Sequence, residues 1–202
     1  MAADITLASE AVNLAWKADF SNYRADFIAS GSTGENKQAL SDALINMMDK
    51  QAKDKKISYP VGIQAACTAI SCPDQTESKY SETSFENVKN NVQSFIDVYK
   101  GGTGSGFDDL ITKAGFASTA ESIETSAQAV ITAIDNNSGT SIYDQATAIN
   151  DATSDGACTN AYASPEPVTT GRSVCSIAGL LKRVTDLLKI DFVTIVNVNL
   201  PG

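Results

Sequence analysis

Histidine is absent from this sequence of 202 residues. A chain without histidine cannot contain a Ser-His-Asp triad, a Cys-His pair, an HExxH zinc site or a histidine general base. Mechanisms that use a Ser-Lys pair or two carboxylates remain open. The carboxylate pairs Glu82/Glu86 and Asp108/Asp109 lie where helices are predicted to begin, and we interpret them as charges that complement helix dipoles. The sequence therefore predicts that the protein is not an enzyme.

Charged residues are also few, at 19% of the chain, and acidic residues outnumber basic ones by 24 to 15. The net charge of −9 repels phosphate backbones and anionic membrane surfaces, which argues against nucleic-acid binding. No apolar run approaches the roughly 20 residues that a membrane span requires. The first residues, MAADITLASEAVNLAW, lack the basic start and continuous apolar stretch of a signal peptide. We expect a soluble chain, either intracellular or the mature form of a secreted protein.

A CxxC redox motif is missing, and the four cysteines, Cys67, Cys72, Cys158 and Cys175, lack the usual zinc spacing. A zinc site built from all four is an alternative, but an even number of cysteines among polar loops favours two disulfides. A Cys67–Cys72 bridge requires that a helix is broken before Pro73, whereas a Cys158–Cys175 bridge closes a loop rich in Pro, Gly and Thr. We therefore predict the pairs Cys67–Cys72 and Cys158–Cys175, and the crossed pairings remain alternatives. Disulfides predict a secreted, extracellular protein. The sequence predicts no metal site and no cofactor.

Apolar residues recur at helical spacing along most of the chain, and a helix is also predicted from Ser173 onwards. The clearest such pattern is formed by Phe85, Val88, Val92, Phe95 and Tyr99. The predicted fold class is all-α: a single irregular helical bundle of six to eight helices, with two disulfides, forming one domain over residues 1–202. The β-branched tail IDFVTIVNVNL instead predicts a short C-terminal β element or an extended tail at residues 191–202. A strand there needs a partner for its backbone groups, either the KISYPVGI stretch at 56–63 or another chain. Residues 153–171 are predicted to be a loop.

An aromatic stripe is the most suggestive feature. Within a helix predicted over residues 4–30, aromatic side chains repeat at steps of three and four. Core packing explains such a stripe, but it can also form the wall of an apolar cavity between helices. The candidate ligand-binding residues are Trp16, Phe20, Tyr23, Phe27, Met47, Phe95 and Tyr99.

Two further motifs are interpreted as structural. GGTGSGFDD, at 101–109, lacks the lysine of a phosphate-binding loop and is interpreted as a linker and helix cap. DATSDG, at 151–156, matches the start of a calcium loop, but Tyr162 stands where the bidentate Glu belongs.

The leading hypothesis is a secreted non-catalytic binding protein that holds a small apolar ligand between helices. The alternative is an extracellular structural or self-assembling component of a matrix, fibre or coat. It would form a homodimer or larger assembly through the strand at residues 191–202.

Overall fold

The structure is a computed structural model that describes residues 2–29, 33–137, 139–165 and 173–197. The chain divides into two compact units, residues 1–42 and 43–202. The described residues form helices joined by turns and contain no strand. The all-α fold class is therefore confirmed.

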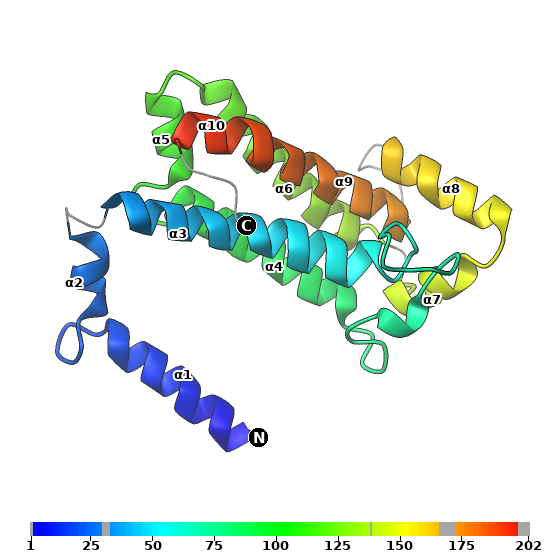
Figure 1. The fold of residues 1–202 in the computed structure, drawn as a ribbon, viewed down its shortest axis with the longest axis horizontal. Helices are drawn as coiled ribbons and strands as arrows, with labels where there is room; N and C mark the ends of the chain where they lie inside the picture. The colour runs from blue at the N-terminus through cyan, green and yellow to red at the C-terminus, as the bar shows by residue number, and fades with distance from the viewer. Residues whose placement is uncertain (1, 30–32, 138, 166–172, 198–202) are drawn as a thin grey trace. The chain divides into compact units, whose positions relative to one another are not determined.

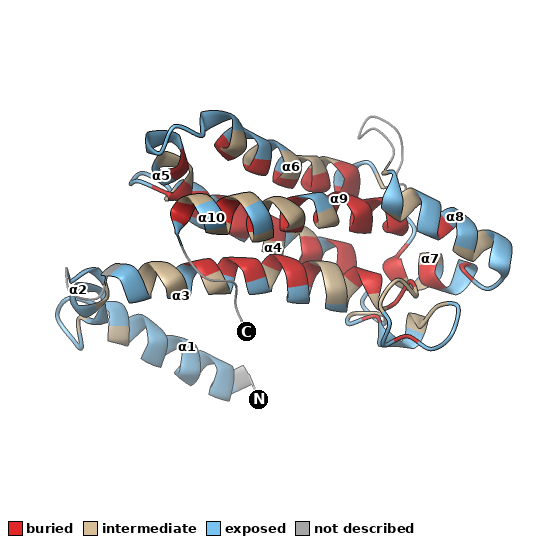
Figure 2. Cartoon of the chain, turned by 45° about the horizontal axis from the view of Figure 1, so that its top comes forward, coloured by how far each residue is buried: buried red, intermediate tan, exposed pale blue. Residues whose placement is uncertain are grey.

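The first unit is built from helices α1 (Ala2–Trp16) and α2 (Tyr23–Ile28) and the start of α3 (Thr33–Asn46). The single helix predicted over residues 4–30 is wrong, because the chain turns between Trp16 and Tyr23, with Asn22 in a left-handed conformation at φ 50°. Helix α1 has no distinct apolar face, because polar residues are distributed among its apolar ones, and its described side chains are almost all exposed (Figure 2).

The second unit is a ring of four helical segments: η1 (Met47–Ser58), α4 (Ser84–Lys100), α6 (Ala117–Asp135) and α9 (Val174–Leu187). Segment η1 is π-helical and continues α3. In the ring η1 packs on α4, α4 on α6, α6 on α9, and α9 on η1 (Figure 1). The other elements of this unit are η2 (Pro73–Gln75), α5 (Phe107–Lys113), α7 (Ile142–Ala148), α8 (Ala152–Ala163), η3 (Leu188–Phe192) and α10 (Val193–Val196).

Helix α4 follows the predicted pattern closely. Its apolar positions at helical spacing all face the core, and the helix ends at Gly101, whose positive φ of 69° suits a glycine C-cap. Burial raises the pKa of the Tyr99 phenol well above its usual range, and its hydroxyl donates to the Ala120 carbonyl oxygen at 3.3 Å. The buried residues of this face are Phe85, Val88, Val92, Phe95, Ile96 and Tyr99.

A buried ion pair joins η1 to η3. The Asp49 carboxylate is 2% exposed and accepts hydrogen bonds from Lys53 Nζ at 2.5 Å and Lys189 Nζ at 2.6 Å. Burial alone would raise the pKa of Asp49, but the hydrogen bonds from Lys189 and Lys53 outweigh it and lower the pKa. Burial also opposes the charge on Lys53, yet the bond to Asp49 raises its pKa. Lys53 therefore stays protonated, which makes it unsuited to act as the base of a Ser-Lys pair.

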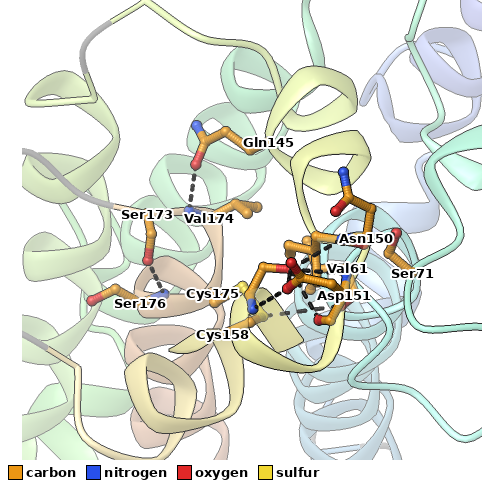
Figure 3. The surroundings of a disulfide bond; sticks show 12 residues. Val61, Ser71, Gln145, Asn150, Asp151, Cys158, Ser173, Val174, Cys175 and Ser176 are labelled. Atoms are coloured by element: carbon orange, nitrogen blue, oxygen red, sulfur yellow. Dashed lines mark hydrogen bonds between the residues drawn. A yellow bond between two sulfur atoms is a disulfide. The ribbon is translucent and has the colours of Figure 1, made fainter. Parts of the chain in front are cut away.

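Both preferred disulfides are present, Cys67–Cys72 and Cys158–Cys175. The first closes a tight loop after η1, in which Ser71 Oγ donates to the Ile149 carbonyl oxygen at 2.8 Å. The second joins α8 to the start of α9, and the Cys158 sulfur lies 4.0 Å from the Val61 carbonyl oxygen (Figure 3). The first loop therefore contacts the end of α7, and the second disulfide contacts the turn after η1.

The predicted C-terminal β element is wrong for the described part of the tail. Residues up to Val196 continue as η3 and α10, where Phe192 and Val196 are buried. Burial of these side chains outweighs the β preference of a β-branched sequence. Residues 198–202 of this prediction lie outside the described residues. The proposed strand partner at 56–63 ends η1 and turns, and the loop predicted from residue 153 is helix α8 as far as Ala163.

Candidate functional site

A surface pocket of about 300 Å³ lies in the second unit, where α4 begins and α6 ends. Three segments supply its walls: the residues around the α4 start, the last turn of α6, and the loop leading into α7. The lining residues are Glu82, Phe85, Glu86, Ile134, Asp135, Asn137, Gly139, Thr140 and Ser141.

The loop between α6 and α7 is held in place by Gln145. Its Nε2 donates to Asn137 Oδ1 at 3.1 Å and to the Thr140 carbonyl oxygen at 3.0 Å. Its Oε1 accepts from the Val174 backbone N–H at 2.8 Å, which ties the pocket loop to the start of α9 (Figure 3). Ser141 caps α7 by accepting from the Asp144 N–H at 3.1 Å. Hydrogen bonds to α7 and to the start of α9 therefore hold this wall of the pocket in place.

The pocket combines carboxylates with an apolar surface. Glu82, Glu86 and Asp135 contribute negative charge, while the largely buried Phe85 and Ile134 contribute apolar atoms. Glu82 has a φ of 58°, a left-handed conformation that residues other than glycine rarely adopt, and its N–H donates to the Ser78 carbonyl oxygen at 2.9 Å. The carbonyl end of α6 adds further negative potential near Asp135. The combination suits a cation carried on an aliphatic chain.

One of the three carboxylates already has a cationic partner. Lys89, on α4, donates from Nζ to Asp135 Oδ1 at 2.6 Å. The hydrogen bond to Asp135 raises the pKa of Lys89, and the charges of Asp135 and Glu86 act in the same direction, against a smaller opposing effect of burial. Lys89 is therefore cationic at neutral pH and bridges α4 to α6 beside the pocket.

The structure separates the seven candidate ligand-binding residues between the two units. Within the first unit, three aromatic rings form a cluster: the Trp16 ring centroid lies 5.1 Å from that of Tyr23 and 5.5 Å from that of Phe27. Trp16 is 42% exposed and Tyr23 48% exposed, so this cluster presents apolar surface. Phe20, in the turn between α1 and α2, is 60% exposed.

The other three candidates belong to the second unit. Phe95 and Tyr99 stack with ring centroids 5.6 Å apart and are completely buried in the core, and Met47 packs against the edge of that core. These positions act as packing residues in the described structure. Ligand binding by the whole set of seven stays a prediction.

The sequence alone does not indicate that the lining residues form a pocket. The sequence predicts that Glu82 and Glu86 are charges that complement a helix dipole, and Glu86 does lie in the first turn of α4. Asp135 lies about fifty residues further along the chain, and only the packing of α4 on α6 brings it to the same pocket. The local signal is the polar run DNNSGTS after a long helix. This run indicates a loop, but it does not indicate which helix packs beside that loop.

The two motifs interpreted as structural behave as such. The Asp109 carboxylate accepts from the Gly106 N–H at 3.1 Å and caps α5, and the Asp151 carboxylate accepts from the Ser154 N–H at 2.8 Å and caps α8. Among the described residues, no three His, Cys, Asp or Glu side chains form a group that could hold a metal ion. In the same part of the chain, no helix has both the length and the apolar character of a membrane span.

Comparison with known proteins identifies a family. Curated proteins and solved structures gave no significant match. The sequence model of imelysin, named as peptidase family M75, matches residues 1–164. That name is a peptidase name, so it contradicts the prediction that the protein is not an enzyme; the missing histidine excluded particular mechanisms and not catalysis in general. Because the match covers more than half of the sequence, the chain belongs to the imelysin family.

Proposed function

We propose that this chain is a secreted imelysin-family domain that binds polypeptides, and that the pocket between α4 and α6 receives a basic side chain of the peptide. The two disulfides support an oxidising, extracytoplasmic compartment. The peptidase name of the family supports a polypeptide as the substrate class.

The composition of the pocket carries the proposal. A lysine or arginine side chain has an apolar stem and a charged tip, and it loses least on leaving water when the stem meets apolar atoms and the tip meets carboxylates. Phe85 and Ile134 provide the first surface, and Glu82 and Glu86 provide the second. The net charge of −9 also attracts cationic peptides over a longer range.

Peptide titration tests this function. A blocked pentapeptide with a central lysine is expected to bind roughly tenfold more tightly than the same peptide with norleucine, a difference of about 1.4 kcal/mol. The double variant Glu82→Gln/Glu86→Gln is expected to lose this preference, because it keeps the shape of the pocket and removes its charge. The matched control is Glu35→Gln/Glu121→Gln, which removes two exposed carboxylates that do not line the pocket.

The measurement is calorimetric titration at low ionic strength, where charge effects are largest. Equal affinity for the lysine and norleucine peptides would refute the proposed pocket. Mass spectrometry of each peptide after incubation shows in the same experiment whether the chain cleaves it.

A second candidate is favoured by the aromatic cluster of the first unit. The exposed rings of Trp16 and Tyr23, with the half-buried Phe27 beside them, are suited to bind a small apolar molecule, the ligand class that the sequence predicts. Trp16 is the single tryptophan of the chain, so its fluorescence reports on this cluster alone. Titration with a fatty acid is expected to shift the Trp16 emission to shorter wavelength, and Tyr23→Ala to weaken the response; an unchanged emission would eliminate this candidate.

A further inference from the structure

Lys89 lies close to two of the carboxylates that line the pocket. It follows Glu86 by three residues on α4, which places the two side chains on the same face of the helix. Its ammonium group reaches across to Asp135, the last residue of α6. Both neighbours of Lys89, Glu86 and Asp135, line the pocket.

The ion pair between Lys89 and Asp135 is partly exposed, so another cation can replace Lys89 on Asp135. The Lys89 side chain is 32% exposed and that of Asp135 is 52% exposed, so either group can be solvated when the other leaves. A surface ion pair of this kind contributes little to stability. Breaking it therefore has little effect on the fold.

We propose that Lys89 is an internal competitor for the pocket: its ammonium group takes the place on Asp135 that the cation of a bound peptide would otherwise use. The inference rests on the proposed function, since it concerns the same pocket. With Lys89 in place, a peptide cation meets Glu82 and Glu86, while Asp135 is already neutralised. Lys89 thus lowers affinity for isolated basic side chains and restricts the pocket to peptides that make further contacts.

The same helix pair provides a matched control. Lys100, also on α4, donates to Glu124 on α6 at 2.5 Å, with side chains 44% and 39% exposed. Neither Lys100 nor Glu124 lines the pocket. Lys89→Met and Lys100→Met therefore make the same change in net charge, and each removes one exposed bridge between α4 and α6.

The experiment compares the lysine pentapeptide on four proteins: the unaltered chain, Lys89→Met, Lys89→Arg and Lys100→Met. Lys89→Met is expected to tighten binding roughly fivefold, because a like charge near the bound cation is removed and a carboxylate is released. Lys89→Arg keeps the competing cation and is expected to bind as the unaltered chain does. The gain should shrink at 0.5 M salt, since screening weakens exposed charges.

Two results separate the inference from the function on which it rests. Equal affinities of Lys89→Met and Lys100→Met, with a persistent preference for lysine over norleucine, would overturn the inference and leave the proposed function in place. No preference for lysine over norleucine in any of the four proteins would overturn both. Circular dichroism confirms that each variant is folded as the unaltered chain is.

Discussion

Replacing Asp49 with asparagine is expected to lower the free energy of unfolding by about 3–5 kcal/mol, the usual effect of removing one partner of a buried ion pair. The Asp49 carboxylate is the group that brings Lys53, on η1, and Lys189, on η3, together. The Lys53 side chain is only 11% exposed, so in the variant its charge stays largely out of water without its main counter-charge. Urea unfolding followed by circular dichroism measures the loss.

Asp186→Asn is the control for this substitution. Asp186 pairs with Lys182 one turn away on α9, and both side chains are nearly half exposed, so the expected loss is below about 1 kcal/mol. Similar losses for Asp49→Asn and Asp186→Asn would show that the buried pair does not stabilise the fold.

The pH dependence of the Asp49 pair follows from the same contacts. The pKa of Asp49 is lowered in the folded state, so its stabilising contribution is complete above the ordinary value of 3.8 and is lost as the pH falls through the lower folded value. The pKa of Lys53 is raised, so its contribution is complete below the ordinary value of 10.5 and is lost as the pH rises through the higher folded value. The difference between the unaltered chain and Asp49→Asn should thus be largest between these limits.

Removing the Cys158–Cys175 disulfide, by replacing both cysteines with alanine, is expected to destabilise the protein by about 3 kcal/mol at 25 °C. The two cysteines are 17 residues apart, and the bridge limits the freedom of the unfolded chain over that span. It also fixes α8 against the start of α9, the helix that packs on both α6 and η1.

The Cys67–Cys72 disulfide is the natural comparison. Its cysteines are only five residues apart, so the same chain-entropy argument gives a smaller loss of about 2 kcal/mol for Cys67→Ala/Cys72→Ala. Urea unfolding of both double variants measures which disulfide contributes more to the free energy of unfolding. A larger loss from the shorter loop would contradict the entropic argument and point to native contacts around Cys67.

Local patterns predicted several helices of the second unit, although not α8, η3 or α10. The spacing of Phe85, Val88, Val92, Phe95 and Tyr99 identified α4 and its buried face, and Ser173 marks the start of α9. Local loop chemistry also led to the preferred disulfides. These features depend on residues close together in the sequence, where propensity, capping and periodicity act.

Features that depend on distant residues could not be predicted in this way. The tail after Leu187 has the composition of a strand, but burial of Phe192 against Phe107, with ring centroids 5.0 Å apart, accompanies a helical path. The regular spacing of the aromatic stripe predicts a single helix, yet a turn that contains Phe20 separates Trp16 on α1 from Tyr23 and Phe27 on α2. The pocket requires Asp135 beside Glu86, and no local pattern contains the packing of α4 on α6.

The order of the disulfide pairing has a consequence for how the protein matures. Each bridge joins cysteines that are neighbours in sequence, the first with the second and the third with the fourth. If the chain is exported as proposed and crosses a membrane N-terminus first, Cys67 and Cys72 meet the oxidising compartment while Cys158 is still on the other side. The native bridges can then form in the order in which their cysteines emerge. Vectorial export would thus favour the correct connectivity without the slow reshuffling that crossed bridges require.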